Sequence, residues 1–159
     1  MVTRQVAHRR RDLDFDLMVT DLAPIDLMIQ RAGRLWRHAR EARPIGGPEL
    51  VVLSADPVDA PDKDWATSVL GRGAYVYPDH VLLWRSARVL FQAGGIATPE
   101  GVRALVEAVY EANSEPTPPA LSPSQNKAVG AAAAAAALAK MNVLVLRAQG
   151  GTGACGLSF

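Results

Sequence analysis

The sequence of 159 residues contains only one cysteine, Cys155, and only three histidines. A single cysteine cannot form a disulfide within the chain, and no cysteine or histidine has a neighbour at the spacing of zinc ligands. Because protein thiols stay reduced in the cytosol, this cysteine usage favours a cytoplasmic protein. The composition therefore predicts a cytoplasmic chain with no metal site.

An excess of charge of one sign and a long apolar run are also missing. The 17 Lys and Arg residues balance 16 Asp and Glu residues, for a formal net charge of +1. No global basic excess indicates nucleic-acid binding, and positive charge is concentrated in the first 43 residues. Even the alanine block, flanked by Lys127 and Lys140, is too weakly apolar for a membrane span. We expect no signal peptide and no membrane partner.

Two short apolar runs with a helical pattern between them predict the start of an α/β fold. Residues 14–22 and the run that begins at Glu49 have the continuous apolar centre of strands buried on both faces. Between them Pro24 suits a helix start, and apolar residues recur at helical spacing to about Arg40, with Trp36 on the apolar side. Strand, helix and strand form the crossover unit of a parallel sheet.

The middle of the chain is predicted to be mainly helical. Residues 56–64 form a loop rich in proline and aspartate, and residues 74–77 predict a short edge strand. Asp79 is placed to cap a helix that ends at Gly94, and Thr98 to cap a second one.

A proline-rich stretch, SEPTPPALSPS, predicts an extended linker before the last part of the chain. Ser122 and Gln125 then match a capping box, followed by a helix through seven alanines to about Met141. An alanine helix has little to bury, so we expect it to pack closely against a surface. Residues 142–148, NVLVLRA, predict a final strand.

Arginines recur at three-residue intervals in QRAGRLWRHAR, residues 30–40. In a helix these side chains would be neighbours, and each like-charge pair costs about 0.2–0.5 kcal/mol unless an anion lies against it. Phosphate is a fitting partner because a guanidinium offers it a planar fork of donors. Two alternatives remain: a solvated basic face without a ligand, and a helix over 30–43 that binds nucleic-acid phosphates through Arg31, Arg40 and Arg43.

Gln30, Arg31, Gly33, Arg34 and Arg37 spell Q-R-x-G-R-x-x-R, which resembles motif VI of superfamily 2 helicases. The longer run DLDFDLMVTDLAPIDLMIQRAGRLWRHAREARP resembles the second RecA-like domain of the CRISPR-associated helicase-nuclease of type I interference systems. The resemblance continues more loosely through YVYPDHVLLWRSARVL and the proline-rich stretch.

The resemblance implies a role for each of these positions in an ATP site between two domains. Arg34 and Arg37 are then the catalytic arginine fingers that reach the triphosphate. Gln30 would order the arginines, and Gly33 would permit close approach of the nucleotide. Asp12 matches the acid of motif V, near the nucleotide ribose. The implied cofactor is ATP with Mg²⁺.

Other parts of such an enzyme have no counterpart in this sequence. There is no G-x-x-x-x-G-K-[ST] phosphate loop, no acidic magnesium box and no His-Asp nuclease pair. We therefore expect a C-terminal fragment that is inactive alone and needs the missing helicase and nuclease domains or a separately encoded half. The parent family implies single-stranded DNA and an RNA-guided surveillance complex as partners. The rival hypothesis is a non-enzymatic module that binds DNA or a partner through the basic helix 30–43.

The resulting division of the chain has four parts. Residues 1–55 are a partial second RecA-like domain, 56–113 a loop and helical extension, 114–122 the proline-rich linker, and 123–159 the start of an accessory domain. Because strands of the RecA-like sheet are missing, we expect exposed sheet surfaces and poor solubility or self-association.

Overall fold

The computed structural model describes residues 13–111 and 116–149, and of residues 141–149 the backbone alone. Asp12 lies outside the described residues. The elements in chain order are β1 (Leu17–Asp21), α1 (Ile25–Ala32), β2 (Glu49–Leu53), α2 (Trp65–Leu70), the 3-10 helix η1 (Gly71–Val76), α3 (His80–Ala93), α4 (Val102–Tyr110) and α5 (Ser122–Gln149). The predicted α/β class is confirmed. The division of the chain into domains stays a prediction.

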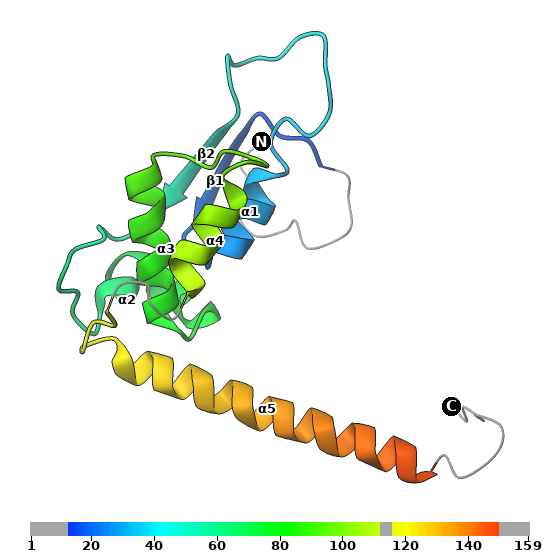
Figure 1. Cartoon of the computed structure of the whole chain (residues 1–159). Helices are drawn as coiled ribbons and strands as arrows, with labels where there is room; N and C mark the ends of the chain where they lie inside the picture. The colour runs from blue at the N-terminus through cyan, green and yellow to red at the C-terminus, as the bar shows by residue number, and fades with distance from the viewer. Residues whose placement is uncertain (1–12, 112–115, 150–159) are drawn as a thin grey trace.

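The two strands form a parallel pair, with Leu17 opposite Glu49 and Asp21 opposite Leu53. The predicted strand, helix and strand unit is thus confirmed. Helices α1, α3 and α4 lie in front of the strands in Figure 1. Full burial of both sheet faces is not observed, because alternate residues of the strands remain 42–49% exposed within the described chain: Leu17, Val19, Val51 and Leu53.

Helix α1 ends eight residues earlier than the sequence predicts. The residue after it, Gly33, caps the helix with φ −66°. The chain then pairs with the segment before β1: Phe15 N–H donates to Arg34 O (3.0 Å), and Trp36 N–H donates to Phe15 O (2.9 Å). These bonds satisfy backbone groups that a continued helix would have satisfied internally, so tertiary pairing overrides the helical periodicity.

The main core is built around α3. Val81, Leu83 and Ala87 are fully buried, and Trp84 is 3% exposed with its indole N–H donating to Val58 O (2.9 Å). The residues packed around them come from distant parts of the chain: Leu22, Ala55, Trp65, Ala66, Leu70, Ala74 and Leu121. Burying these apolar side chains is the main force that holds the segments together.

A smaller core joins α1 to α4. Ile25 is fully buried against Leu105 and Val109 of α4. At the rim, Tyr110 donates its hydroxyl hydrogen bond to Asp26 Oδ1 at 2.7 Å. Burial of the phenol and the adjacent Asp26 carboxylate both raise the pKa of Tyr110, so this bond persists at neutral pH.

Capping signals predict α3 well and α4 less well. Asp79 accepts the Leu82 N–H (3.1 Å), and Gly94 ends α3 with φ 66°, a conformation that favours glycine. In contrast, α4 begins at Val102 instead of just after Thr98, because the chain first makes a turn closed by the Gly101 N–H on Ala97 O (3.0 Å).

The predicted edge strand at residues 74–77 is wrong, since this segment lies in η1 and the residue that follows it. The helix α2 before it was not predicted at all. Its Trp65, Ala66 and Leu70 are buried in the main core, so packing stabilises a helix of only six residues.

Helix α5 differs from its prediction at both ends. Ser122 lies inside the helix and donates to Pro118 O (3.3 Å), so the predicted capping box is not formed. At the other end the helix continues through residues 142–148, where a strand was predicted. A strand needs a hydrogen-bonded neighbour, whereas the alanine run propagates a helix on its own.

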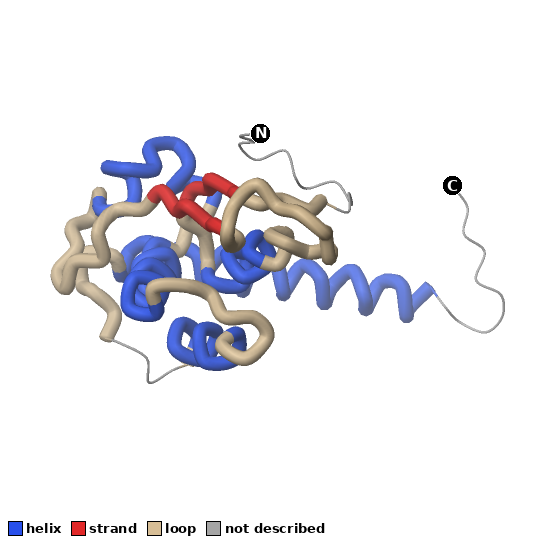
Figure 2. Tube along the Cα trace, turned by 90° about the horizontal axis from the view of Figure 1, so that it is seen from above, coloured by secondary structure: helices blue, strands red, loops and turns tan. Residues whose placement is uncertain are grey.

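The alanine run also makes no close contact with the body of the molecule. Residues 131–137 are all exposed, and α5 projects away from the other helices in Figures 1 and 2. The expected packing against a surface is therefore wrong for the described chain. Leu121, just before α5, is 1% exposed in the main core and fixes the start of the helix. None of the described helices is long and apolar enough to cross a membrane.

Candidate functional site

Four of the five predicted site residues lie on one continuous segment at the end of α1. Gln30 is exposed in the last turns of the helix, and Gly33 is exposed at its cap. Arg34 is half-buried and Arg37 is exposed in the irregular stretch that follows, residues 34–43, which we call the arginine loop. The expected basic helix over 30–43 is wrong, because helical structure stops at Ala32.

Arg31 points into the chain and donates hydrogen bonds to several groups there. Its Nη1 donates to Thr20 Oγ1 (2.7 Å) and to Asp21 O (2.8 Å), and its Nη2 donates to the Tyr77 hydroxyl (3.0 Å). These bonds tie α1 to the end of β1 and to the residue after η1. Arg31 therefore has a structural role, which its position in the sequence motif does not reveal.

Arg40 and Arg43 bind carboxylates in the segment just before the first strand. Arg43 forms a two-pronged pair with Asp14, with both N–O distances 3.2 Å, and a 3.0 Å bond with Asp16. Arg40 Nε lies 2.7 Å from Asp14 Oδ2. Arg43 Nη2 also donates to the backbone carbonyl of His38. These bonds fold the end of the arginine loop back against residues 14–16.

The Asp14 carboxylate is the centre of this network. Its side chain is 3% exposed, against 9% for Arg43 and 50% for Arg40. Burial by itself would raise the pKa of Asp14, but the Arg43 hydrogen bond, the charges of Arg40 and Arg43, and the Arg37 N–H hold it below its ordinary value. Asp14 is therefore ionised at neutral pH.

Gly33 is not required by the packing of this chain. Its φ of −66° is open to any residue, and an added Cβ would meet only backbone oxygens at 3.5 and 3.8 Å, which is ordinary contact. Within the described chain nothing excludes a side chain here. A need for glycine would thus come from a group that approaches from outside.

Arg34 differs from Arg31 in the bonds that its side chain makes. Its backbone is fixed by the bond from Phe15 N–H, but no hydrogen bond or ion pair of its side chain is found among the described residues. Within the described residues the guanidinium of Arg34 therefore has no anionic partner.

Trp36 lies between the two predicted arginine fingers with φ 47°. A bulky residue rarely adopts this left-handed conformation. The Arg43 guanidinium lies 5.1 Å from the centre of the Trp36 ring, a cation–π contact. The predicted placement of Trp36 on a helix face is wrong, and the residue instead makes a turn between Arg34 and Arg37.

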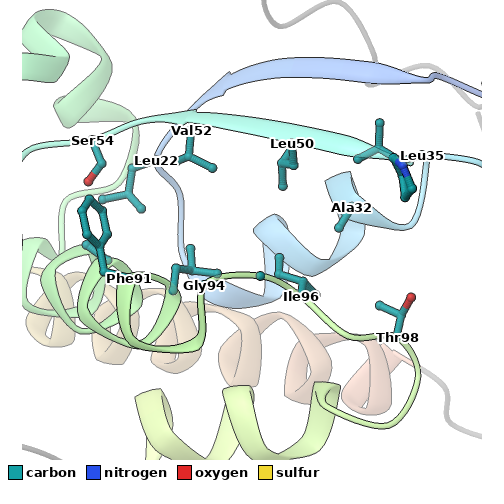
Figure 3. A pocket seen from close by; sticks show the side chains of 14 residues that line it. Leu22, Ala32, Leu35, Leu50, Val52, Ser54, Phe91, Gly94, Ile96 and Thr98 are labelled. Carbon is teal, nitrogen blue, oxygen red and sulfur yellow. The ribbon is translucent and has the colours of Figure 1, made fainter. Parts of the chain in front are cut away.

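An apolar pocket of about 420 Å³ lies beside the arginine loop, between β2 and the end of α3. Leu50 and Val52 point from β2 toward the loop that carries Gly94 and Ile96, with Phe91 at one end (Figure 3). Ala32 and Leu35 line the side nearest α1. Sequence reasoning missed this pocket because its lining comes from segments that are far apart along the chain.

Sequence reasoning also missed Asp14 and Asp16 as parts of the site, and it considered Arg43 only as a residue that binds nucleic-acid phosphates. Their charges are visible in the sequence, but 27 and 29 residues separate the carboxylates from Arg43, so no local spacing signals the contact. In the described part of the chain, no three His, Cys, Asp or Glu side chains are grouped to hold a metal ion.

Comparison with known proteins identifies related chains. Residues 1–40 match the family model described as CRISPR-associated nuclease/helicase Cas3, C-terminal. A CRISPR-associated endonuclease/helicase Cas3 of Thermus thermophilus is 39% identical over 137 residues, which cover 82% of this chain and 14% of the relative.

Two solved structures show the same relationship. The crystal structure of T. fusca Cas3-ATP has a TM-score of 0.61 and 36% identity, and the match covers 80% of this chain and 14% of that one. A CRISPR RNA-guided surveillance complex, pre-nicking, contains a chain with a TM-score of 0.57 and 34% identity, with coverage of 80% and 15%. The chain thus spans about one seventh of the length of these proteins. By sequence and by structure, this chain belongs to the CRISPR-associated nuclease/helicase Cas3 family and corresponds to part of its C-terminal region.

Proposed function

We propose that the chain supplies the arginine fingers, Arg34 and Arg37, to an ATP site between two RecA-like domains of a CRISPR antiviral helicase-nuclease. Alone it is inactive, because the other half of that site lies on a domain this sequence does not contain. The proposal covers a part of the enzyme, since the chain matches only 14% of the Thermus thermophilus relative.

The contrast among the arginines is the observation that carries this proposal. The guanidinium groups of Arg31 and Arg43 bind groups of the chain itself. Arg34 has no such partner in the described residues, although its backbone is held firmly in place. A positioned guanidinium without an internal partner suits a phosphate, and an arginine finger contributes about 10³–10⁵ in rate.

Gly33 and Gln30 support the same assignment. Gly33 is exposed beside Arg34 and leaves an open surface where a Cβ would otherwise project. The exposed Gln30, one helical turn earlier, can order the fingers and bind the phosphate side of the nucleotide. Asp12, outside the described residues, is assigned to the ribose side by its match to motif V.

The positively charged side chains of the proposed site suit a triphosphate and do not suit a metal ion. Arg34 and Arg37 carry positive charge and would hold the oxygens of the terminal phosphate, whereas the magnesium ligands and the phosphate loop belong to the first RecA-like domain. ATP with Mg²⁺ supplies the phosphoryl group whose transfer to water drives translocation. The matched Cas3-ATP structure comes from a protein of the same family.

The remaining partners follow from the same proposal. In the complete enzyme the two RecA-like domains would move along single-stranded DNA, and the nuclease domain would cut it. The match to a chain of an RNA-guided surveillance complex supports recruitment of the complete enzyme to such a complex.

A module that binds nucleic acid through Arg31, Arg40 and Arg43 has less support. Two of these guanidinium groups are held inside the chain, and Arg40 binds Asp14 while 50% exposed. Such a module would bind DNA without nucleotide, and its affinity would fall steeply with salt.

Reconstituted ATP hydrolysis tests the proposal. The chain alone should give no magnesium-dependent turnover, whereas a mixture with a separately produced first RecA-like domain of the Thermus thermophilus relative should hydrolyse ATP. Arg34→Ala should lower that rate by about 10³ or more. Arg103→Ala removes an 87% exposed arginine from α4 and should leave the rate unchanged. Turnover by the chain alone, or equal rates for both variants, would contradict the proposal.

A further inference from the structure

We propose that Asp14 is a positioning residue that sets the conformation of the arginine loop and, through it, the place of Arg37. This inference rests on the proposed function of Arg37 as a finger. Asp14 has no motif role in the sequence, and in the described chain its side chain binds the loop backbone and two loop arginines.

The first argument is the direct bond between Asp14 and the backbone of Arg37. Asp14 Oδ1 accepts the Arg37 N–H at 2.9 Å. A charge-assisted bond to a main-chain N–H fixes the backbone from which the Arg37 side chain projects. This bond acts on the position of Arg37 without a contact to its guanidinium.

The second argument is that the same carboxylate also holds the far end of the loop. Both Asp14 oxygens bind Arg43, each at 3.2 Å, and Arg40 Nε binds Oδ2 at 2.7 Å. One side chain that is 3% exposed thus bonds to the loop at residues 37, 40 and 43. Without it, the loop would keep the Arg43 bond to Asp16 but lose the bond at the Arg37 N–H.

The third argument is the conformation of Trp36. A φ of 47° is unfavourable for a bulky side chain and persists only where the surroundings hold it. Here the Trp36 N–H binds Phe15 O at 2.9 Å on one side, and the Arg37 N–H binds Asp14 on the other. The turn that separates Arg34 from Arg37 therefore depends on residues 14 and 15.

Asp16 provides a matched control. It is a neighbouring carboxylate that binds Arg43 Nη1 at 3.0 Å and is 23% exposed. No contact joins it to the backbone of residues 34–37 among the described bonds. A role in general charge balance would be shared by both acids, whereas of the two only Asp14 binds the Arg37 N–H.

Amide hydrogen exchange measured by NMR on the full chain tests the inference. In Asp14→Ala the Arg37 amide should exchange at least about tenfold faster than in wild type, because its acceptor is gone. In Asp14→Asn, which keeps an acceptor but loses the charge, the increase should be smaller. Asp16→Asn should leave Arg37 unchanged, and Ala87 in α3 should be unaffected in all three variants. Equal Arg37 exchange in wild type and both Asp14 variants would overturn the inference, as would equal acceleration in Asp16→Asn.

A double-mutant cycle then connects the loop to nucleotide binding. ATPγS affinity is measured for the chain mixed with a first RecA-like domain, with Asp14→Ala and Arg37→Ala made singly and together. If Asp14 acts through Arg37, adding Asp14→Ala to Arg37→Ala should weaken binding less than twofold further, and full additivity would contradict this. If the wild-type mixture fails to bind while exchange at Arg37 responds as expected, the proposed function fails and the positioning of the loop by Asp14 stands.

Discussion

The arginine loop is not helical although its apolar residues recur at helical spacing, whereas α5 is helical through a stretch that touches almost nothing. In the loop, Phe15 and Asp14 bind the backbone of residues 34–37 and replace the helical bonds. In α5, residues 131–137 are exposed, and alanine propensity alone carries the helix. The comparison shows that long-range polar contacts determine the structure of the arginine loop, whereas local propensity determines it in the alanine run of α5.

The two regions should respond very differently to loss of side-chain volume. Leu121→Ala removes a side chain that is 1% exposed in the main core, at the point where α5 begins, and should lower the free energy of unfolding by about 2–5 kcal/mol. Ala134→Gly in the exposed run should cost only about 1 kcal/mol, confined to the helix. Urea unfolding followed by tryptophan fluorescence measures the change in unfolding free energy for each variant. A large effect of Ala134→Gly on the core transition would show that α5 packs on the body.

Within the motif, Arg31 and Arg34 give a second comparison, between an arginine whose side chain binds the chain and one whose side chain binds no described residue. Arg31→Ala removes hydrogen bonds to Thr20, Asp21 and Tyr77 and should destabilise the chain by about 2–3 kcal/mol. Arg34→Ala removes no side-chain bond found in the described chain and should change stability by less than about 0.5 kcal/mol. Thermal melts of both variants measure this difference, and comparable destabilisation would refute the division into a structural and an available arginine.

Gly33→Ala should separate stability from nucleotide binding. Alanine is compatible with φ −66° and with the space at this position, so the free energy of unfolding should stay constant or rise by up to about 1 kcal/mol. At the same time, the added methyl should weaken ATPγS binding by the reconstituted mixture. A variant that loses stability without losing binding would mean that Gly33 serves the fold.

The pH response of the arginine loop is the smallest expected effect. The pKa of Asp14 lies below its ordinary value of 3.8 in the folded chain, where the carboxylate faces Arg40 and Arg43, and Asp16 binds the same Nη1 of Arg43. Stabilisation by this ionised group is complete above the ordinary value and is lost as the pH falls through the lower folded pKa.

Protection of the Arg37 amide, corrected for intrinsic exchange, should therefore be the same at about pH 7 and about pH 5 and decline only below about pH 4. Asp14→Asn has no carboxylate to titrate and should show no such decline. Loss of protection already near pH 5 would indicate that another group controls the loop.

Capping and periodicity predicted those elements whose ends are set locally. Asp79 and Gly94 bound α3 as expected, and the two apolar runs became β1 and β2. The end of α1 could not be predicted, because it depends on Phe15, twenty residues before Leu35 in the paired bridge. Helix α2 depends on the burial of Trp65 in a core assembled from the whole chain.

The candidate site was predictable only in part for the same reason. The motif residues at positions 30–37 could be read from their spacing and from the family resemblance, and their assignment as nucleotide-binding residues stays a proposal. The internal roles of Arg31 and Arg43 could not be read, since their partners are up to 46 and 29 residues away. A motif of arginines shows which side chains are charged, whereas the fold decides which of them remain available to a ligand.

Calorimetry of ATPγS binding with Mg²⁺ tests the proposed site most directly. The chain is measured alone and mixed with a first RecA-like domain, as wild type, Arg34→Ala, Arg37→Ala and the Arg103→Ala control. We predict binding only in the mixture, lost with either finger variant and retained in the control. Binding of equal strength in the mixture with both finger variants would contradict the proposal that these arginines complete the ATP site.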